Sequence, residues 1–129
     1  GNATWYYGTT GDENVILGTF AAGDNTSNHL TLTGSIYIGQ EAGYQGVANF
    51  STVVGYQAGH KAYGAQNTFI GHRCGLSNSG GTVSAAGTTA IGYHALFNLQ
   101  SGNANTVMGK DAGSQIKTGH SNVCLGSYA

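Results

Sequence analysis

A short motif recurs seven times along the chain, and every copy runs through a β-branched segment into a glycine. The copies are NVILG, SIYIG, STVVG, NTFIG, TTAIG, NTVMG and NVCLG, and they end at Gly18, Gly39, Gly55, Gly71, Gly92, Gly109 and Gly126. Successive glycines lie 16 to 21 residues apart. Such a period is typical of repeat proteins, in which each copy forms one structural unit that packs against its neighbours.

Equivalent positions of the copies carry similar residues, which indicates one shared conformation. The residue four before the glycine is always small and polar: Asn14, Ser35, Ser51, Asn67, Thr88, Asn105 and Asn122. The residue three before is β-branched and the residue immediately before is aliphatic, as a strand favours. Alternate residues share a face of a strand. We therefore expect these last two positions to face the inside of a coil, and the polar residues to form a stacked ladder of side-chain hydrogen bonds.

The repeats predict an all-β fold, a parallel β-solenoid or β-roll of about seven rungs, with residues 14–129 as the repeat domain. Each rung adds about 4.8 Å to such a coil. The density of glycine and β-branched residues excludes a helix. Residues 1–13 are expected to form an N-terminal cap or a partial repeat, and the two longest spacings predict loops at Asp24–Leu32 and Ser77–Ala86.

The residue two before each glycine is never polar, and the face assignment above places it outside the coil. An exposed apolar stripe marks an interaction surface. We therefore expect an oligomer interface built from Ile16, Tyr37, Val53, Phe69, Ala90, Val107 and Cys124. Self-association as a cyclic trimer, about an axis parallel to the rod, is the favoured arrangement. The alternative is that another part of the same coil covers the stripe.

The two residues after each glycine are variable and mostly polar, so they can change without disrupting the coil. The richest pairs, which we identify as candidate receptor-binding residues, are Tyr56, Gln57, His72, Arg73, Tyr93 and His94. Tyr and His side chains can stack on sugars and form hydrogen bonds with their hydroxyl groups. This favours a cell-surface glycan or protein as the partner. The alternative is that these residues bind no partner and only make the edge of the coil soluble.

The segments GYQAG, NTFIG, TTAIG and NTVMG resemble repeats of bacteriophage tail fibres and related adhesive fibres. They also look like repeats in the head domains of trimeric autotransporter adhesins. The resemblance covers residues 14–129 and implies an elongated trimer, located outside the cell or on a virion, that serves as a fibre shaft or presents a surface to a receptor. The period here is longer and less regular, and Leu96 stands where a glycine is expected, so that turn is expected to bend differently.

Composition argues against several other classes of function. Four Lys and Arg residues are too few to follow a nucleic-acid backbone, and no apolar run approaches the ~20 residues needed for insertion across a membrane. The acidic residues and histidines form no catalytic pair and no metal-binding pattern, and His72 and His94 are expected to face opposite ways because they differ by one position. We expect no enzymatic activity, no cofactor and no metal. Cys74, assigned inside, and Cys124, assigned outside, are expected to be free thiols, because the rungs separate them too far for a disulfide.

Two other functions stay open. The first is a self-assembling extracellular filament subunit stacked head to tail, because the terminal GSYA followed by Gly1 would complete the motif. The second is ice binding through a threonine column on successive rungs, formed by Thr52, Thr68, Thr89 and Thr106. Ice-binding solenoids need a flat, outward pair of such columns, and here a single column is assigned to the inside.

Overall fold

The computed structural model describes residues 11–23, 31–46, 49–78 and 80–129, which contain short β-strands and no helix. The strands are β1 (Val15–Leu17), β2 (Ile36–Ile38), β3 (Thr52–Val54), β4 (Ala62–Tyr63), β5 (Thr68–Ile70), β6 (Val83–Ser84), β7 (Thr89–Ile91), β8 (Thr106–Met108) and β9 (Val123–Leu125). Consistent with this content, the described residues hold no helix that could span a membrane. The seven longer strands are the seven copies of the motif.

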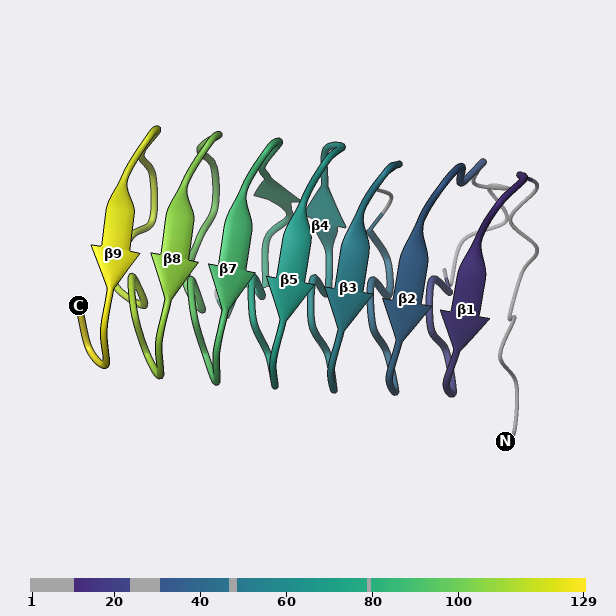
Figure 1. The fold of residues 1–129 in the computed structure, drawn as a ribbon, viewed down its shortest axis with the longest axis horizontal. Helices are drawn as coiled ribbons and strands as arrows, with labels where there is room; N and C mark the ends of the chain where they lie inside the picture. The colour runs from purple at the N-terminus through teal and green to yellow at the C-terminus, as the bar shows by residue number, and fades with distance from the viewer. Residues whose placement is uncertain (1–10, 24–30, 47–48, 79) are drawn as a thin grey trace.

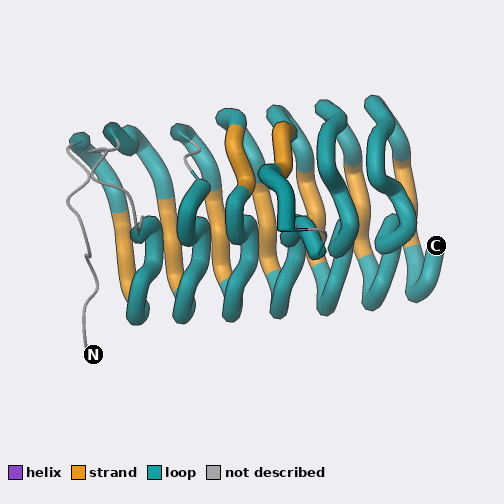
Figure 2. The backbone as a smooth tube through the Cα atoms, turned by 180° about the vertical axis from the view of Figure 1, so that it is seen from behind, coloured by secondary structure: helices purple, strands orange, loops and turns teal. Residues whose placement is uncertain are grey.

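These copies form one parallel sheet in the order β1-β2-β3-β5-β7-β8-β9, as Figure 1 shows. Each strand pairs in register with the next, so that Thr68 is opposite Thr89 and Phe69 is opposite Ala90. On the return side of the coil, β4 pairs with β6 in parallel, and both are visible from behind in Figure 2. The all-β parallel β-solenoid is therefore confirmed, with six turns joining the seven strands of the main sheet.

The predicted orientation of the strands was wrong. The residue two before each glycine faces inward: Tyr37, Val53, Phe69, Ala90 and Val107 are at most 2% exposed. The residues on either side of it face outward, and Ile70 is 36% exposed. Hydrophobicity alone could not choose between the faces, because both are apolar. The polar residue four before the glycine decides the orientation, since it shares a face with the residue two before and its hydrogen bonds are made inside the coil.

The predicted polar ladder is confirmed, and its partners are backbone groups of the next rung. The side-chain oxygen of each member accepts a hydrogen bond from the backbone N–H of the member one rung later. The donor–acceptor distances are 3.0 Å for Ser35–Asn14, 3.2 Å for Ser51–Ser35, 3.1 Å for Asn67–Ser51, 3.0 Å for Thr88–Asn67, 3.4 Å for Asn105–Thr88 and 3.0 Å for Asn122–Asn105. Small polar side chains can be buried here because each one is satisfied in this way.

The glycine that ends each strand is required by close approach of the backbone. Gly71 has a φ of 137°, and a Cβ atom at this position would lie 2.3 Å from the carbonyl oxygen of Gly92 in the next rung. The same arrangement holds for Gly92, where a Cβ atom would lie 2.4 Å from the carbonyl oxygen of Gly109. The recurring glycine therefore sets how tightly successive rungs stack.

The core is a narrow column inside the coil in which side-chain volume is balanced between positions. Large inward rings coincide with a second glycine, four residues after the glycine that ends the strand: a Cβ atom at Gly75 would lie 2.7 Å from the ring of Phe69. Where the inward residue is Ala90, the corresponding position is Leu96, which is fully buried. The φ of Leu96 is 52°, close to the 66° of Gly75. The turn at Leu96 therefore does not bend differently, contrary to expectation, and its side chain fills space inside the coil.

The two cysteines are free, as expected, but only one of them lies where it was placed. Cys74 is fully buried, and its thiol donates a hydrogen bond to the carbonyl oxygen of Ala90 at 2.9 Å. Burial raises the pKa of this thiol to about 12, so Cys74 behaves as a small apolar residue. Cys124 belongs to the inward column at the C-terminal end of the coil and is packed against the core.

The two predicted insertions differ in how far they can be compared with the structure. Residues 24–30 of the first loop, and residues 1–10 of the expected cap or partial repeat, lie outside the described residues. In the second, Ser77–Ala86, only part is a loop, because Val83 and Ala85 are buried and β6 belongs to the return wall. The extra length is therefore added before β6, and the sheet register is kept.

Candidate functional site

The first two residues after five of the seven repeat glycines, from Gly39 to Gly109, project from one edge of the coil, and we call this row of side chains the edge ladder. Its members are Gln40, Glu41, Tyr56, Gln57, His72, Arg73, Tyr93, His94, Lys110 and Asp111. The second residue of each pair has a left-handed backbone, with φ of 53° at Arg73 and 55° at His94. Its N–H donates to the carbonyl oxygen of the first residue in the preceding rung, at 2.9 Å from Arg73 to Tyr56. The rungs therefore hold these side chains at a fixed repeat.

The first residues of three successive pairs form an aromatic stack. The ring centroids of Tyr56 and His72 lie 5.2 Å apart with planes inclined by 22°, and those of His72 and Tyr93 lie 5.1 Å apart with planes inclined by 14°. The faces of the central ring are therefore covered by its neighbours. Tyr56 and Tyr93 remain 37% and 47% exposed. Between neighbouring rings the stack therefore presents ring edges and hydroxyl groups, and the faces of His72 are closed to stacking on a sugar.

The second residues of the pairs form a chain of polar contacts beside the stack. Gln57 donates from its Nε2 to Oε2 of Glu41 at 2.7 Å, and its Oε1 accepts from Nε of Arg73 at 2.9 Å. The guanidinium of Arg73 lies 6.0 Å from the centre of the Tyr56 ring. The amide of Gln57 thus connects an acid to a base two rungs away, and it fixes the orientation of the guanidinium.

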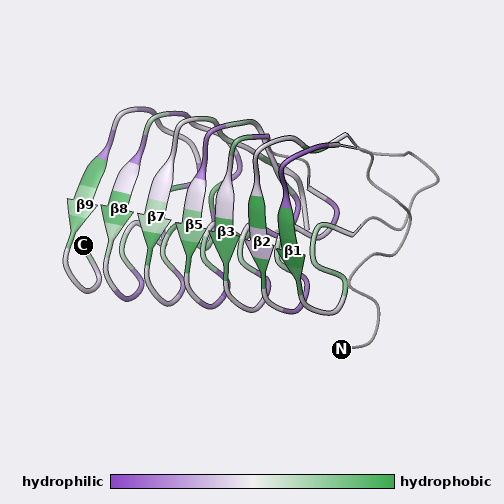
Figure 3. Ribbon diagram, turned by 45° about the vertical axis from the view of Figure 1, so that its right-hand side comes forward, coloured by the Kyte–Doolittle hydropathy of each residue, from purple (hydrophilic) through white to green (hydrophobic). Residues whose placement is uncertain are grey.

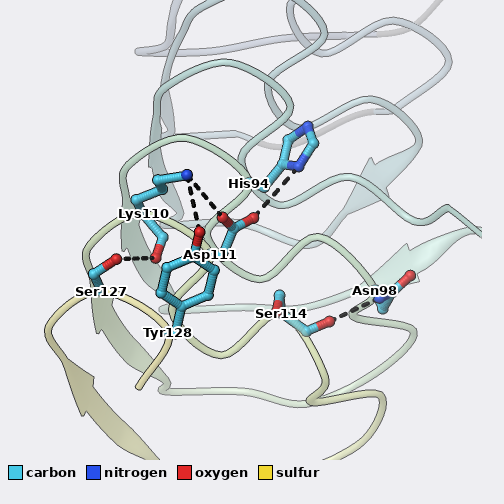
Figure 4. Close-up of polar contacts among 7 residues, drawn as sticks. All are labelled: His94, Asn98, Lys110, Asp111, Ser114, Ser127 and Tyr128. Atoms are coloured by element: carbon cyan, nitrogen blue, oxygen red, sulfur yellow. Dashed lines mark hydrogen bonds and ion pairs between the residues drawn. The ribbon is translucent and has the colours of Figure 1, made fainter.

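His94 is held between two rings and one carboxylate. Its ring centroid lies 3.9 Å from that of Tyr93 and 4.3 Å from that of Phe97. Its Nδ1 lies 3.5 Å from Oδ1 of Asp111, as drawn in Figure 4, while its buried Nε2 finds no hydrogen-bond partner among the described residues. Burial lowers the pKa of His94, opposed by the charge of Asp111. The neutral imidazole with its proton on Nδ1 is the form that fits these contacts.

The structure brings all six predicted receptor-binding residues together. One detail of that prediction was wrong: the ring centroids of His72 and His94 lie 5.6 Å apart, so these histidines do not face opposite ways. The left-handed turn after the glycine breaks the alternation of a strand, and both side chains lean to the same edge.

Several residues around the edge ladder were not identified from the sequence. Phe97 lies five residues after its glycine, as do Tyr44 and His60, whose rings are 5.5 Å apart. Nε2 of His60 lies 4.0 Å from Oε2 of Glu41, and burial lowers the pKa of His60. The fifth position after the glycine therefore continues the polar and aromatic edge. Aligning the repeats on their glycines places these three ring-bearing residues at the same position, and this signal could have identified them.

A second surface is formed by the outward side chains of the main sheet, which we call the outer face. Its members are Val15, Leu17, Ile36, Ile38, Thr52, Val54, Thr68, Ile70, Thr89, Ile91, Thr106, Met108, Val123 and Leu125. In Figure 3 the strands near the two ends of the row are mainly green, which marks hydrophobic residues, and β7 and β8 are paler, which marks intermediate hydropathy. The prediction that the interface consists of Ile16, Tyr37, Val53, Phe69, Ala90, Val107 and Cys124 was therefore wrong, because these side chains face the inside of the coil.

The threonine column also lies on the outer face rather than inside. Thr52, Thr68, Thr89 and Thr106 occupy successive rungs of the main sheet. The neighbouring outward column is aliphatic, from Leu17 through to Leu125. The paired threonine columns that ice binding requires are therefore not formed by the described strands.

The C-terminal end of the coil contains a hollow of about 370 Å³, lined by Gly113, Ser114, Gln115, Ile116, Cys124, Tyr128 and Ala129. No three His, Cys, Asp or Glu side chains of the described residues are grouped so that they could hold a metal ion. Comparison of the chain with models of protein families, with curated proteins and with solved structures found no match.

Proposed function

We propose that the chain is a structural and attachment module of an extracellular or virion-borne fibre. In this proposal, copies of the chain associate through the outer face and present the edge ladder to a cell-surface receptor. The observation that carries the proposal is the outer face itself: Ile70, Met108 and Leu17 are 36%, 48% and 60% exposed in a continuous apolar row. An exposed apolar surface of this extent is typical of an interaction site.

A second copy of the chain is the occupant that best fits the outer face. The face repeats one pair of side chains at the spacing of parallel strands, about 4.8 Å. A partner must offer grooves at the same spacing along the whole length of the sheet, and an identical coil does so. Cyclic association about an axis parallel to the rod satisfies this for every copy, and a trimer is the smallest closed ring beyond a dimer.

The oligomeric state can be tested by placing a charge on the outer face. Ile70→Asp should reduce the molar mass measured by light scattering to that of the monomer, because a carboxylate in an apolar interface loses its hydration without gaining a partner. The matched control is Tyr63→Asp, since Tyr63 is similarly exposed at 41% but lies on the return wall. A wild-type chain that is already monomeric would refute association through the outer face.

Attachment to a receptor is tested separately with intact cells. Replacing Tyr56, His72 and Tyr93 together by Ala should abolish binding of the fluorescently labelled oligomer to host cells and leave its molar mass unchanged. Multivalent presentation makes this loss easy to measure, because weak contacts are multiplied along an oligomer. Undiminished binding by the triple variant would place the receptor site elsewhere.

A filament subunit stacked head to tail is the second candidate, and the hollow at the C-terminal end favours it. The edge of β9 that faces away from β8 pairs with no described strand, and the inward side chain of Cys124 lines the hollow beside it. Open strand edges pair readily with further strands. Electron microscopy of the purified chain distinguishes the candidates: filaments that lengthen with concentration favour stacking, and short rods of fixed length favour the fibre module.

A further inference from the structure

Arg73 is the most unusual charged residue of the edge ladder, because the described contacts of its guanidinium are with Gln57 and the Tyr56 ring rather than with a carboxylate. No carboxylate among the described residues lies within ion-pair distance of its guanidinium. Its Nε is committed to Gln57, and no hydrogen bond joins its two terminal nitrogens to another described residue. The contact with Gln57 leaves the fork of the guanidinium fixed in orientation and available to a ligand.

The fork of an arginine side chain fits a planar oxyanion. Two parallel N–H groups match the two oxygens of a carboxylate, and this pairing gives both strength and direction. Arg73 is half-buried. An anion bound there would therefore interact through less water than one at a fully exposed lysine, and the contact between them would be stronger.

The surroundings of Arg73 suit a ligand that carries many hydroxyl groups and few charges. His72, Tyr56 and Tyr93 present ring edges and polar atoms along the same edge. Further along the ladder, Glu41 and Asp111 bring negative charge, two rungs before and two rungs after Arg73. A polyanion with a charge on every unit would meet these carboxylates, whereas a saccharide with an isolated acidic group would not.

We infer that the edge ladder is an acidic-saccharide site in which Arg73 binds the carboxylate of the sugar and the neighbouring Tyr and His side chains contact its hydroxyl groups. This inference rests on the proposed attachment function and adds the chemical class of the receptor. It also accounts for the ring stack, because covered ring faces favour recognition through hydrogen bonds at the ring edges over stacking on the sugar.

The inference is tested with an array of sialylated, uronate-containing, sulfated and neutral saccharides probed with the labelled wild-type oligomer. The saccharides that bind should be those with a carboxylate. Arg73→Gln should weaken binding to them by about tenfold or more, since a charge-assisted hydrogen bond contributes about 1.5–3 kcal/mol. Arg73→Lys should recover only part of the loss, because the charge returns without the fork.

Two controls separate this effect from general changes. Lys117→Gln also removes one positive charge, but from an exposed position on the return wall, next to the bridge between Ser101 and Thr118, and it should leave binding unchanged. Methyl esterification of a bound uronate oligosaccharide removes the charge of the ligand alone, and it should reproduce the effect of Arg73→Gln.

Several results of these experiments would contradict the acidic-saccharide site. Binding confined to neutral saccharides, equal binding by wild type and Arg73→Gln, or the absence of any bound saccharide would each refute the acidic-saccharide site. If wild type still attaches to cells in those cases, the attachment function stands with a different receptor class. A preference for sulfated over carboxylated saccharides would also overturn the assignment, because it would replace the carboxylate as the recognised group.

Discussion

The backbone N–H of Thr88 donates to Oδ1 of Asn67 at 3.0 Å, and this bond ties two rungs together from inside the coil. Nδ2 of the same side chain donates to the carbonyl oxygens of Gly64 and Ala85 at 2.9 and 2.8 Å. One amide therefore satisfies three backbone groups. The polar ladder therefore stabilises the coil from inside by linking successive rungs.

Asn67→Ala should lower the free energy of unfolding by about 3 kcal/mol, because it leaves buried backbone groups without partners. Asn67→Ser should lose clearly less, since Ser35 and Ser51 accept the corresponding bond elsewhere in the column. Urea denaturation followed by circular dichroism measures both. Equal losses for the two variants would show that the amide contributes only through its volume.

Gly71→Ala should destabilise the coil far more than Gly81→Ala does. A Cβ atom at Gly71 would collide with the backbone of Gly92, and its φ of 137° is unsuited to alanine, whereas a Cβ atom at Gly81 would meet nothing within 4 Å. The difference should exceed about 2 kcal/mol, the usual range for strained backbone positions. Comparing the melting temperatures of the two variants tests this, and similar values would contradict the proposed rung contact.

Phe69→Ala should cost about 3–5 kcal/mol, as expected for an aromatic ring removed from a packed core. Ile70→Ala, at the adjacent outward position, should have little effect on the unfolding of the isolated monomer. Its effect should appear in the association equilibrium. Denaturation at several protein concentrations separates the two contributions, and a large, concentration-independent loss for Ile70→Ala would contradict the outward orientation of its side chain.

Acidification should destabilise the chain through His60 and His94. Burial lowers the pKa of both below 6.5 in the folded state, so the unfolded chain binds more protons at low pH. Their contribution is thus fully present above the unfolded pKa and is lost as the pH falls through the folded values. Melting temperatures between pH 7.5 and 5 should decline. In His94→Phe, which keeps a stacked ring, the decline should be shallower, and an unchanged profile would exclude His94 as a contributor.

The strand positions and the parallel coil could be predicted because the repeat fixes both. The orientation of the strands could not be read from hydrophobicity, since Ile70 and Phe69 are equally apolar and only packing separates them. The information was nevertheless present in Ala90 and Leu96: the repeat that carries a leucine in place of the later glycine is the one whose inward residue is alanine. This volume compensation can arise only if both side chains share the interior.

The edge ladder could be located from the sequence but not oriented. The pairs after each glycine were identified by their variability, and the structure places them on one edge. Their mutual arrangement depends on the left-handed backbone of residues such as Arg73 and His94. Arginine and histidine do not by themselves indicate a left-handed backbone, so this arrangement could not be predicted. The involvement of Phe97 was missed because its position follows from the turn that begins after Gly92 rather than from strand periodicity.

The glycines that end the strands stack directly on one another from rung to rung, so whole repeats can be removed from the coil or added to it. Because Gly55 meets Gly71 as Gly71 meets Gly92, excising one period would rejoin contacts of the same kind and shorten the rod by a single step. Duplicating a period would lengthen it equally. The length of the rod and its ligand specificity can therefore change independently. The length depends on the number of repeats, and the specificity depends on the side chains that each repeat displays.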